Sequence, residues 1–381
     1  MEIGVAGAGF SGAVLARELA AAGHHVTVHE TEHHVGGHCH TERDAETGVL
    51  VHVHGPHIFH TSDERVWAYV RRFAEMVPFV HRARTTVEGR VYSLPVNLMT
   101  INQLFGTALT PEQARAFMVT ESDASIGEPA NFEEQALKTV GRRVYEAFFA
   151  GYTRKQWGRD PRDLPASVFS RLPVRFSYDD RYYDDTYQAI PRDGYTALVE
   201  RILDHPSIDV LLASPLDPTD RGAYEHVIWT GPLDAWWHHE HGSLGYRTLD
   251  FEVFRGDGDH QGIAIMNYGD VDVPYTRVTE HKHFAPWEHH ARTVCSREYS
   301  RAAGPDDVPY YPMRLESDER VVARYVDAAR EEERVTFVGR LGTYRYLDMD
   351  DTIGEALATA DVIVAAISSG APIPTFVADR R

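Results

Sequence analysis

The chain has 381 residues, and its 57 acidic and 38 basic side chains give a formal net charge of −19. An acidic excess of this size argues against binding to nucleic acid or to an anionic membrane, and the apolar runs are too short to predict membrane insertion. The two cysteines, Cys39 and Cys295, allow no disulfide framework. Together with a first segment that lacks the basic start of a signal peptide, they favour a cytoplasmic location.

The first residues predict the start of a dinucleotide-binding domain. Residues 3–6 form a short apolar strand, followed by Gly7, Gly9 and Gly12 in a G-x-G-x-x-G sequence, after which a helical pattern runs to Gly23. In this setting Gly7 permits a tight turn, and Gly9 lets a pyrophosphate approach the backbone at the helix N-terminus. Gly12 lets the helix pack closely against the strand.

The second strand supports this prediction and bears on the choice of cofactor. Residues 25–29 form a strand that ends at Glu30. An acid at this place accepts hydrogen bonds from both ribose hydroxyls and repels a 2′-phosphate. The Gly36-Gly37 pair a few residues later brings the chain close to the cofactor, which favours FAD over NAD.

The later segments predict insertions into this domain rather than a second domain placed after it. Capping residues at Thr110 and Asn131, each followed by acidic side chains, mark helix starts. The segments expected in chain order are a helical region over about 110–159, strands over about 174–187, a strand over 227–230, strands over 245–299, a strand over 335–340, a helix over 350–366 and a loose tail from about 371.

A group of aromatic and polar side chains in the helical region is a candidate ligand site. Phe148 and Tyr152 are spaced to share a helix face, and Tyr152 and Trp157 are placed to stack on a ligand base. The alternative is that these rings form the helical core, an interpretation that we favour for Phe149. Arginines and tyrosines further along suit a diphosphate, because they offer charged bidentate and neutral donors, although a surface ion pair is the alternative for any single arginine.

These motifs resemble those of bacterial UDP-galactopyranose mutases. The resemblance extends from the N-terminal glycines to about Ala356, and its strength lies in the order of many motifs rather than in any one. The motifs are GPHIFHT from Gly55, SLP from Ser93 with Asn97, TINQLF from Thr100, GYTRKQWG from Gly151, LPAS from Leu164, LPVRF from Leu172, YQAIP from Tyr187, PYTR from Pro274, EHKHF from Glu280, YYP from Tyr310 and GRL from Gly339.

The resemblance implies an α/β fold with a discontinuous FAD-binding Rossmann-like domain, an inserted helical domain and an antiparallel β-sheet domain. The FAD-binding domain is expected over residues 1–80, 190–245 and 315–381. The expected bounds of the other two are 95–172 for the helical domain, which carries substrate residues and a mobile loop, and 81–94, 173–189 and 246–314 for the sheet domain.

The resemblance also implies an unusual use of a flavin. Family members interconvert the six- and five-membered ring forms of a nucleotide-linked sugar, UDP-galactopyranose and UDP-galactofuranose, with no net redox change. Reduced FAD supplies N5 as the nucleophile at the anomeric carbon, which makes this covalent catalysis by the cofactor. An electron source, NAD(P)H or a reductase, and a homodimer are further expectations.

Site residues are assigned by resemblance, motif by motif. Arg171, on what resembles a mobile loop, and Arg277 would hold the diphosphate, and His60 would lie near the isoalloxazine ring. The residues expected at the cofactor are Gly7, Gly9, Ser11, Gly12, Glu30, Gly37, His38, His57, Ile58, Arg340, Leu347, Asp348 and Met349. Those expected at the nucleotide sugar are Phe148, Tyr152, Thr153, Trp157, Tyr182, Asn267, Tyr311 and Tyr346.

Three histidines depart from the family pattern. His38 follows the glycine pair where asparagine is usual, and His40 and His54 stand where tyrosine is usual. With 22 histidines in the chain, compositional drift explains the changes as well as altered specificity does. A metal site formed by these histidines with Cys39 is not expected, because the spacing matches no known site.

Two other functions remain open. One is a sibling mutase that acts on a different nucleotide sugar, such as a dTDP-6-deoxyhexose used in antibiotic biosynthesis, because the motifs do not separate uracil from thymine. The other is an FAD-dependent oxidoreductase, or a flavin-binding protein without activity. Net oxidation of the substrate would distinguish an oxidoreductase from a mutase.

Overall fold

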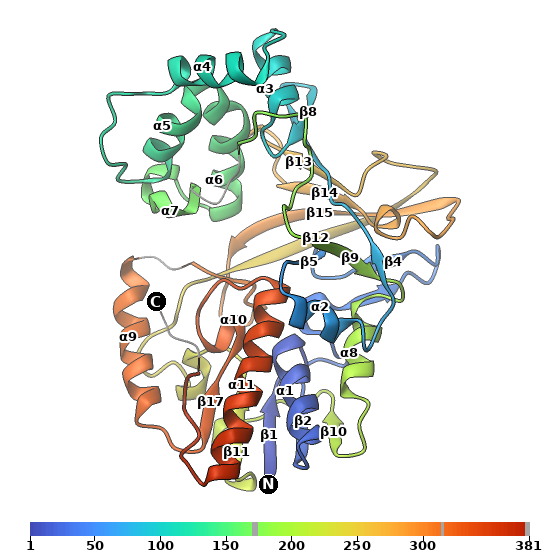
Figure 1. The fold of residues 1–381 in the computed structure, drawn as a ribbon, viewed down its shortest axis with the longest axis vertical. Coiled ribbons are helices and arrows are strands. Elements are labelled where there is room, and N and C mark those ends of the chain that lie inside the picture. The colour runs from blue at the N-terminus through green and yellow to red at the C-terminus, as the bar shows by residue number, and fades with distance from the viewer. Residues whose placement is uncertain (170–173, 314–315, 378–381) are drawn as a thin grey trace.

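The computed structural model describes residues 1–169, 174–313 and 316–377. At one end of the molecule, a parallel sheet of five strands has β1 at its centre (Figure 1). In spatial order its strands are β10 (Ile208–Leu211), β2 (His25–His29), β1 (Glu2–Ala6), β11 (His226–Trp229) and β17 (Val335–Phe337). The strands expected over 3–6, 25–29 and 227–230 are therefore present, and distant parts of the chain do build one sheet. The strand expected over 335–340 ends at Phe337, because Gly339–Gly342 form the short helix α10.

Helices cover this sheet and supply most of its core. α1 (Phe10–Ala21) packs between α8 (Tyr195–Leu203) and α11 (Met349–Ser369). Among the described residues α11 is long and apolar enough to span a membrane by length and composition alone. Its Ile353, Leu357 and Ile363 are buried in the core around α1, however, so packing within the protein accounts for its apolar face.

A second, seven-stranded sheet crosses the middle of the molecule, where its long strands β12 and β15 separate the parallel sheet from the helical region (Figure 1). Its strands in spatial order are β16 (Tyr311–Pro312), β12 (Tyr246–Asp257), β15 (Arg292–Ala302), β14 (Arg277–Glu280), β13 (Ile265–Tyr268), β7 (Ala83–Val87) and β8 (Arg90–Leu94). All neighbours are antiparallel except β13 and β7, a parallel pair that the sequence did not predict.

The helical region forms the other end of the molecule (Figure 1). It consists of α3 (Leu98–Phe105), α4 (Pro111–Glu121), α5 (Phe132–Val144), a π-helical segment (Tyr145–Ala150), α6 (Gly151–Trp157) and α7 (Ala166–Phe169). The expected helix starts are confirmed, since the side chains of Thr110 and Asn131 accept hydrogen bonds from the backbone N–H groups of Gln113 and Glu134.

The strand expected over about 174–187 was wrong. Residue 174 makes one isolated bridge with Val96, and β9 (Tyr187–Pro191) begins where the prediction ended. β9 lies between β5 (Phe59–Thr61) and β6 (Met76–Pro78) in a separate sheet. The reason is local charge: Arg181 pairs with Asp179, and Arg175 pairs with Asp184, so the segment forms ion-paired turns instead of a ladder.

The loose tail expected from about 371 was also wrong as far as the structure describes it. The backbone N–H of Phe337 donates to the carbonyl of Thr375, and Thr336 Oγ1 donates to the carbonyl of Pro374 at 2.8 Å. The ring of Phe376 stacks on that of Phe337 with centroids 5.5 Å apart. The tail therefore covers the free edge of β17.

The remaining elements complete the fold. They are β3 (Thr41–Arg43), which pairs with β4 (Leu50–His52), α2 (Glu64–Val70), α9 (Glu316–Arg330), α10 (Gly339–Gly342), and 3₁₀ turns at Gly37–Cys39, Pro161–Asp163, Pro218–Ala223, Asp234–Trp237 and His281–Phe284.

Candidate functional site

The glycine-rich turn between β1 and α1 has the shape that its sequence predicts. Gly7 has a φ of +99°, a conformation that side chains disfavour, and a Cβ on Gly12 would lie 1.9 Å from the carbonyl oxygen of Gly7. Gly9 differs, because the nearest atom that its Cβ would meet is the Cα of Gly37, 3.8 Å away. Gly7 and Gly12 therefore serve the fold itself, and the space next to Gly9 is free for a ligand.

Glu30 closes one side of this turn. Its buried carboxylate accepts hydrogen bonds from the backbone N–H groups of Ala8 at 2.7 Å and Glu32 at 3.0 Å. These contacts fix the carboxylate at the end of β2, next to the glycine turn. Each oxygen keeps a lone pair, so the group can still accept hydrogen bonds from ribose hydroxyls.

The opposite side of the turn comes from the C-terminal part of the chain. A Cβ on Gly339, at the start of α10, would lie 2.4 Å from Ser11 Oγ, so this backbone packs directly on α1. Arg340 follows, and its Nη2 donates to the carbonyl of Leu347 at 2.6 Å. Asp348 is the N-cap position of α11, and Met349 is its first residue.

Histidines line the space between these two sides. Burial lowers the pKa of His57 to about 4 and holds that of His38 well below its ordinary value, and the charge of Arg340 adds to both effects. Both rings are therefore neutral at neutral pH. His38 stacks on Tyr310 with centroids 4.7 Å apart, while His57 Nδ1 lies 2.8 Å from the carbonyl oxygen of Gly55. Ile58 is buried in a small apolar cluster.

The other two departures from the family pattern fall in the same place. His40 stacks on His34 with centroids 3.5 Å apart, and His54 Nδ1 lies 2.6 Å from Tyr310 Oη. Burial lowers the pKa of His40 and lowers that of His54 to about 4. The three unusual histidines thus lie together with His34 and Tyr310 beside the expected cofactor position, and burial lowers the pKa of all three.

Arg277 is the cation around which the second half of the site is built. It lies on β14, where its Nη2 donates to Tyr152 Oη of α6 at 3.2 Å and its Nε lies 3.1 Å from Glu298 Oε1 of β15. Burial works against the charge of Arg277, but Glu298 and the surrounding phenols outweigh it and raise the pKa. Asn267 pairs directly with Arg277 across β13 and β14, so the two side chains share one face of the sheet.

Tyrosines connect this cation to Arg340. The rings of Tyr311 and Tyr346 are stacked 5.9 Å apart, and the Arg340 guanidinium lies 5.5 and 5.2 Å from their centroids. Tyr182 and Tyr311 are both close enough to Arg277 to affect its pKa. The expected cofactor and substrate groups therefore meet at Arg340 and these rings.

His60 has a definite orientation. Its ring stacks on Tyr183 with centroids 3.7 Å apart, and its Nδ1 lies 2.8 Å from Asp185 Oδ2. Ser62 Oγ donates to the other oxygen of the same carboxylate at 3.0 Å. Asp185 thus fixes the tautomer of His60 whenever that ring is neutral, with the proton on Nδ1.

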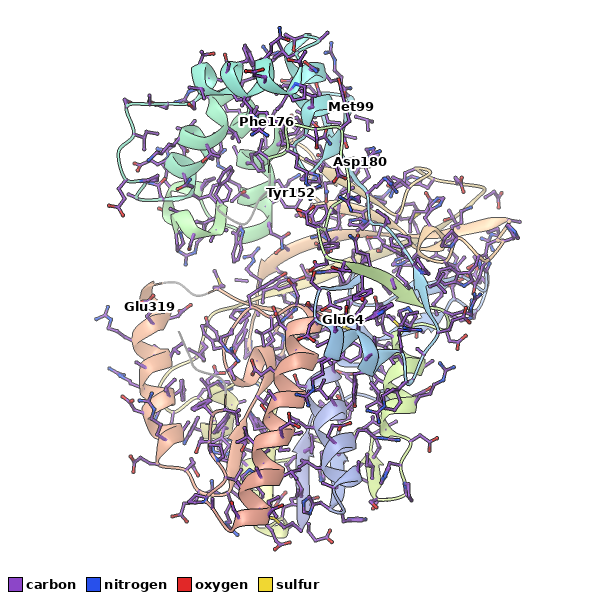
Figure 2. The ribbon with its side chains drawn as sticks, in the orientation of Figure 1. Glu64, Met99, Tyr152, Phe176, Asp180 and Glu319 are labelled. Carbon is purple, nitrogen blue, oxygen red and sulfur yellow. The ribbon has the colours of Figure 1, made fainter. Side chains whose placement is uncertain are left out.

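The residues of the helical region that were expected at the nucleotide sugar differ in burial and in what they contact. Tyr152 lies on the side of that region facing the long strands (Figure 2), where burial raises its pKa to about 12. Phe148 is 5% exposed and packs edge-on against Tyr92 in the helical core, and Thr153 is also buried. Trp157 is half-buried against the same core. Arg171 lies outside the described residues.

Several residues that complete the site were not identified from the sequence. Glu298 is one member of an alternating strand, and only the register of β14 with β15 places it beside Arg277. Asp185 belongs to a run of charges that gives no hint of His60. Lys155 was visible in the GYTRKQWG motif, yet its contacts with a loop more than a hundred residues away could not be seen there.

One group of possible metal ligands occurs among the described residues, formed by Asp259, Glu280 and His283. Its carboxylates already have partners. Glu280 accepts hydrogen bonds from three backbone N–H groups and from Thr293, and Lys282 pairs with Asp259 at 2.5 Å. The geometry therefore assigns this group to holding the 258–262 turn against β14.

The chain is similar to several known proteins. A family model described as UDP-galactopyranose mutase matches residues 147–346, and one described as an NAD(P)-binding Rossmann-like domain matches residues 5–73. The chain is 52% identical over 377 residues to a protein of Klebsiella pneumoniae described as a probable UDP-galactopyranose mutase, covering 99% of this chain and 98% of that one.

A second relative carries a different name. A dTDP-fucopyranose mutase of Escherichia coli is 48% identical over 367 residues, covering 94% of this chain and 97% of the relative. Among solved structures, a reduced UDP-galactopyranose mutase matches with a TM-score of 0.72 at 15% identity, covering 98% of each chain. At that identity the structural match shows the shared fold.

Proposed function

Because this chain belongs to the UDP-galactopyranose mutase family, we propose that it is an isomerase that converts UDP-galactopyranose to UDP-galactofuranose and back, with no net redox change. The observation that carries the proposal is the Arg277–Tyr152 contact. It places a charge-assisted donor and a phenol side by side, and Tyr311, which packs against Arg340, lies close enough to Arg277 to raise its pKa. Such a set suits a diphosphate next to a flat ring system.

The cofactor that fits these residues is FAD. The free space at Gly9, the buried Glu30 carboxylate and the close packing of Gly339 on Ser11 form a cradle at the N-terminus of α1, where a pyrophosphate is stabilised. Gly37, His38 and His57 come from a second side, and Arg340 with residues 347–349 from a third. These residues would hold the flavin, and the chemistry supplied by reduced FAD would be a nucleophile for the anomeric carbon.

The protein's own contribution is to stabilise the leaving group. Departure of the nucleotide diphosphate builds negative charge, so donors that are already oriented lower the barrier most. Glu298 pairs with the Arg277 guanidinium by charge, 3.1 Å from Nε but without a hydrogen bond, while Nη2 is directed toward Tyr152. Tyr182, Tyr311, Tyr346 and Asn267 would add neutral donors, and Arg171 remains a second predicted cation.

The direct test is isomerisation by reduced enzyme. Purified protein reconstituted with FAD and treated with dithionite should convert UDP-galactopyranose to a new isomer that anion-exchange chromatography separates. The air-oxidised protein should be nearly inactive, and the reductant should not be consumed in proportion to product. Full activity of the oxidised protein, or stoichiometric oxidation of the sugar, would overturn the proposal and would favour the oxidoreductase alternative.

A second substrate class has its own support. The relative named dTDP-fucopyranose mutase is nearly as similar to this chain as the first, so a dTDP-linked deoxysugar is the alternative substrate. A panel of UDP- and dTDP-linked hexoses and deoxyhexoses, assayed with the same reduced enzyme, decides between them by kcat/KM. We also propose that NAD(P)H or a reductase supplies the electrons in the cytoplasm.

We further propose the division into three domains given above, and a homodimer. The separate apolar cores around α1 and around α5 support the division. The homodimer is proposed from the family resemblance, and it would cover apolar side chains such as Val91, Met99 and Val119, which are 49%, 53% and 72% exposed in and near the helical region. Light scattering coupled to gel filtration measures the mass directly.

A further inference from the structure

Lys155 binds one loop through an unusually complete set of acceptors. Its Nζ donates to the carbonyl oxygens of Tyr268 at 2.7 Å, Asp270 at 2.9 Å, Val273 at 3.0 Å and Tyr275 at 3.0 Å. An ammonium has three N–H donors, so at least one donor is shared between two carbonyls. Tyr268 is the last residue of β13, and the other three acceptors lie in the connection between β13 and β14.

This connection is short and carries important residues at both ends. Asn267 immediately precedes Tyr268, and Arg277 is the second residue after Tyr275. Lys155 and Tyr152 lie on the same short helix, α6, three residues apart, so they face the same side. The helix and the loop are therefore joined at two points, by the Lys155 ammonium and by the Arg277–Tyr152 hydrogen bond.

A third contact makes the approach of the two elements close. A Cβ on Gly151, the first residue of α6, would lie 2.1 Å from the carbonyl oxygen of Gly269 in the same loop. Two further bonds fix the loop on its other side. The N–H of Gly269 donates to the carbonyl of Thr86, and that of Thr276 to the carbonyl of Glu298. The loop is thus held between α6 and the sheet.

The positive charge of Lys155 offsets the repulsion among the four carbonyl dipoles that surround it. Four carbonyl dipoles point their negative ends at one place, an arrangement that is repulsive unless a cation or several donors occupy the centre. A neutral side chain of similar size would fill the space without satisfying the carbonyls. The loop would then relieve the repulsion by moving its backbone, and Arg277 would move with it.

We propose that Lys155 is a positioning residue, whose ammonium holds the β13–β14 loop so that Arg277 and Asn267 meet Tyr152 in the geometry that binds the nucleotide diphosphate. The inference rests on the proposed function and deepens it. Lys155 acts through the loop, not by contact with the reacting atoms.

The test compares Lys155→Ala with a matched lysine control. The chain has three lysines, and Lys138 is an exposed one whose Nζ donates to the single carbonyl of Gly127. Lys155→Ala is expected to lower kcat/KM by roughly a hundredfold, the order that a displacement of about 1 Å costs, and to weaken binding of UDP. Its FAD content should equal that of Lys138→Ala, which should retain the activity of the unmodified protein.

Chemical rescue separates positioning from simple loss of stability. n-Propylammonium replaces the part of the side chain that Lys155→Ala removes, so it should restore kcat/KM by about tenfold or more, whereas neutral n-propanol should not. Tyr152→Phe should cost much less in the Lys155→Ala background than alone, because both substitutions break the same geometry. Unchanged kcat/KM in Lys155→Ala, or rescue by propanol as well, would overturn the inference.

A measurement that does not depend on turnover distinguishes failure of the proposed function from failure of the positioning role of Lys155. Amide hydrogen exchange of residues 269–276 should be faster in Lys155→Ala than in Lys138→Ala. If the unmodified protein fails to isomerise any nucleotide sugar, the proposed function falls even if this loop exchanges as expected. If exchange and activity are both unchanged, only the inference falls. If Lys155→Ala cannot fold or hold FAD, the residue serves the fold and the positioning role is overturned.

Discussion

Arg277 must keep its charge available to a ligand and must also tolerate burial when no ligand is bound. Glu298 resolves this conflict, because its buried carboxylate, 3.1 Å from Nε, compensates the charge and is itself held by a hydrogen bond from Thr276 Oγ1 at 3.1 Å. In the absence of a ligand, the phenol oxygen of Tyr152 accepts a hydrogen bond from Nη2 of Arg277. The guanidinium is therefore fixed in orientation before any anion arrives, which is the condition for electrostatic stabilisation of a transition state.

Replacement of Arg277 by Ala should lower kcat/KM by about a hundredfold or more, the loss typical of removing one oriented donor. Arg277→Lys should restore little, because a point charge does not reproduce the planar guanidinium. Steady-state kinetics with the reduced enzyme measure both variants. Arg301→Ala is the control, since Arg301 pairs with Asp250 and Asp307 at the surface of the next strand. Normal turnover in Arg277→Ala would mean that the diphosphate binds elsewhere.

At the scale of elements, the β1–α1 turn separates two uses of glycine. Gly12 is needed for helix packing, because any Cβ there would collide with the carbonyl of Gly7 at 1.9 Å, whereas Gly9 faces free space bounded by Gly37. The structure thus assigns Gly12 to the fold, and we propose that Gly9 leaves room for the ligand. These are the separate roles that the motif predicts for the two glycines.

Substitution of the two glycines by Val should consequently have different effects on folding and on FAD binding. Gly9→Val should fold and lose FAD, so its absorbance spectrum should lack the flavin bands while its circular dichroism is retained. Added FAD should raise the melting temperature of the unmodified protein and leave that of Gly9→Val unchanged, since a ligand stabilises only the form that binds it. Gly12→Val should lose both FAD and soluble, folded protein. A Gly9→Val variant with full flavin content would refute the assignment.

The whole molecule contains many histidines that burial keeps neutral. Burial lowers the pKa to about 4 for His54, His57 and His226, and to about 3 for His81 and His281. In an unfolded chain each of these histidines has a pKa of about 6.5. As the pH falls from 6.5 toward 4, the unfolded state therefore binds protons at these histidines while the folded state does not. Acidification through this window must therefore destabilise the fold.

His226 allows a measurement away from the site. It lies in the parallel sheet, where Nε2 is 2.9 Å from Thr336 Oγ1, and a shift to about 4 corresponds to about 3 kcal/mol of stability lost by pH 4. His226→Gln should be less stable than the unmodified protein at pH 7, and this gap should close by pH 4.5. The midpoint of urea unfolding at each pH measures it. Parallel pH profiles for the two proteins would contradict the buried, neutral state of His226.

Much of the architecture could be predicted because its signals are local. The turn glycines, the caps at Thr110 and Asn131 and the alternating strands of 245–299 depend on neighbours within a few residues. The two predictions that were wrong concern segments whose conformation depends on contacts that the local pattern does not show. Residues 174–186 contain strand-forming tyrosines, but their ion pairs favour turns, and the tail beyond 371 becomes ordered only because β17 offers it an edge.

By itself, the sequence determined the dinucleotide-binding turn, the division of the chain into helical and strand segments, and the family, because motifs such as GYTRKQWG are contiguous in the chain. Only the tertiary structure decided which side chains act together. Glu298 beside Arg277, Asp185 beside His60 and Lys155 beneath the 269–276 loop are joined by strand register and by packing between elements. Contacts of this kind link residues that are distant in the chain, so no local pattern can record them.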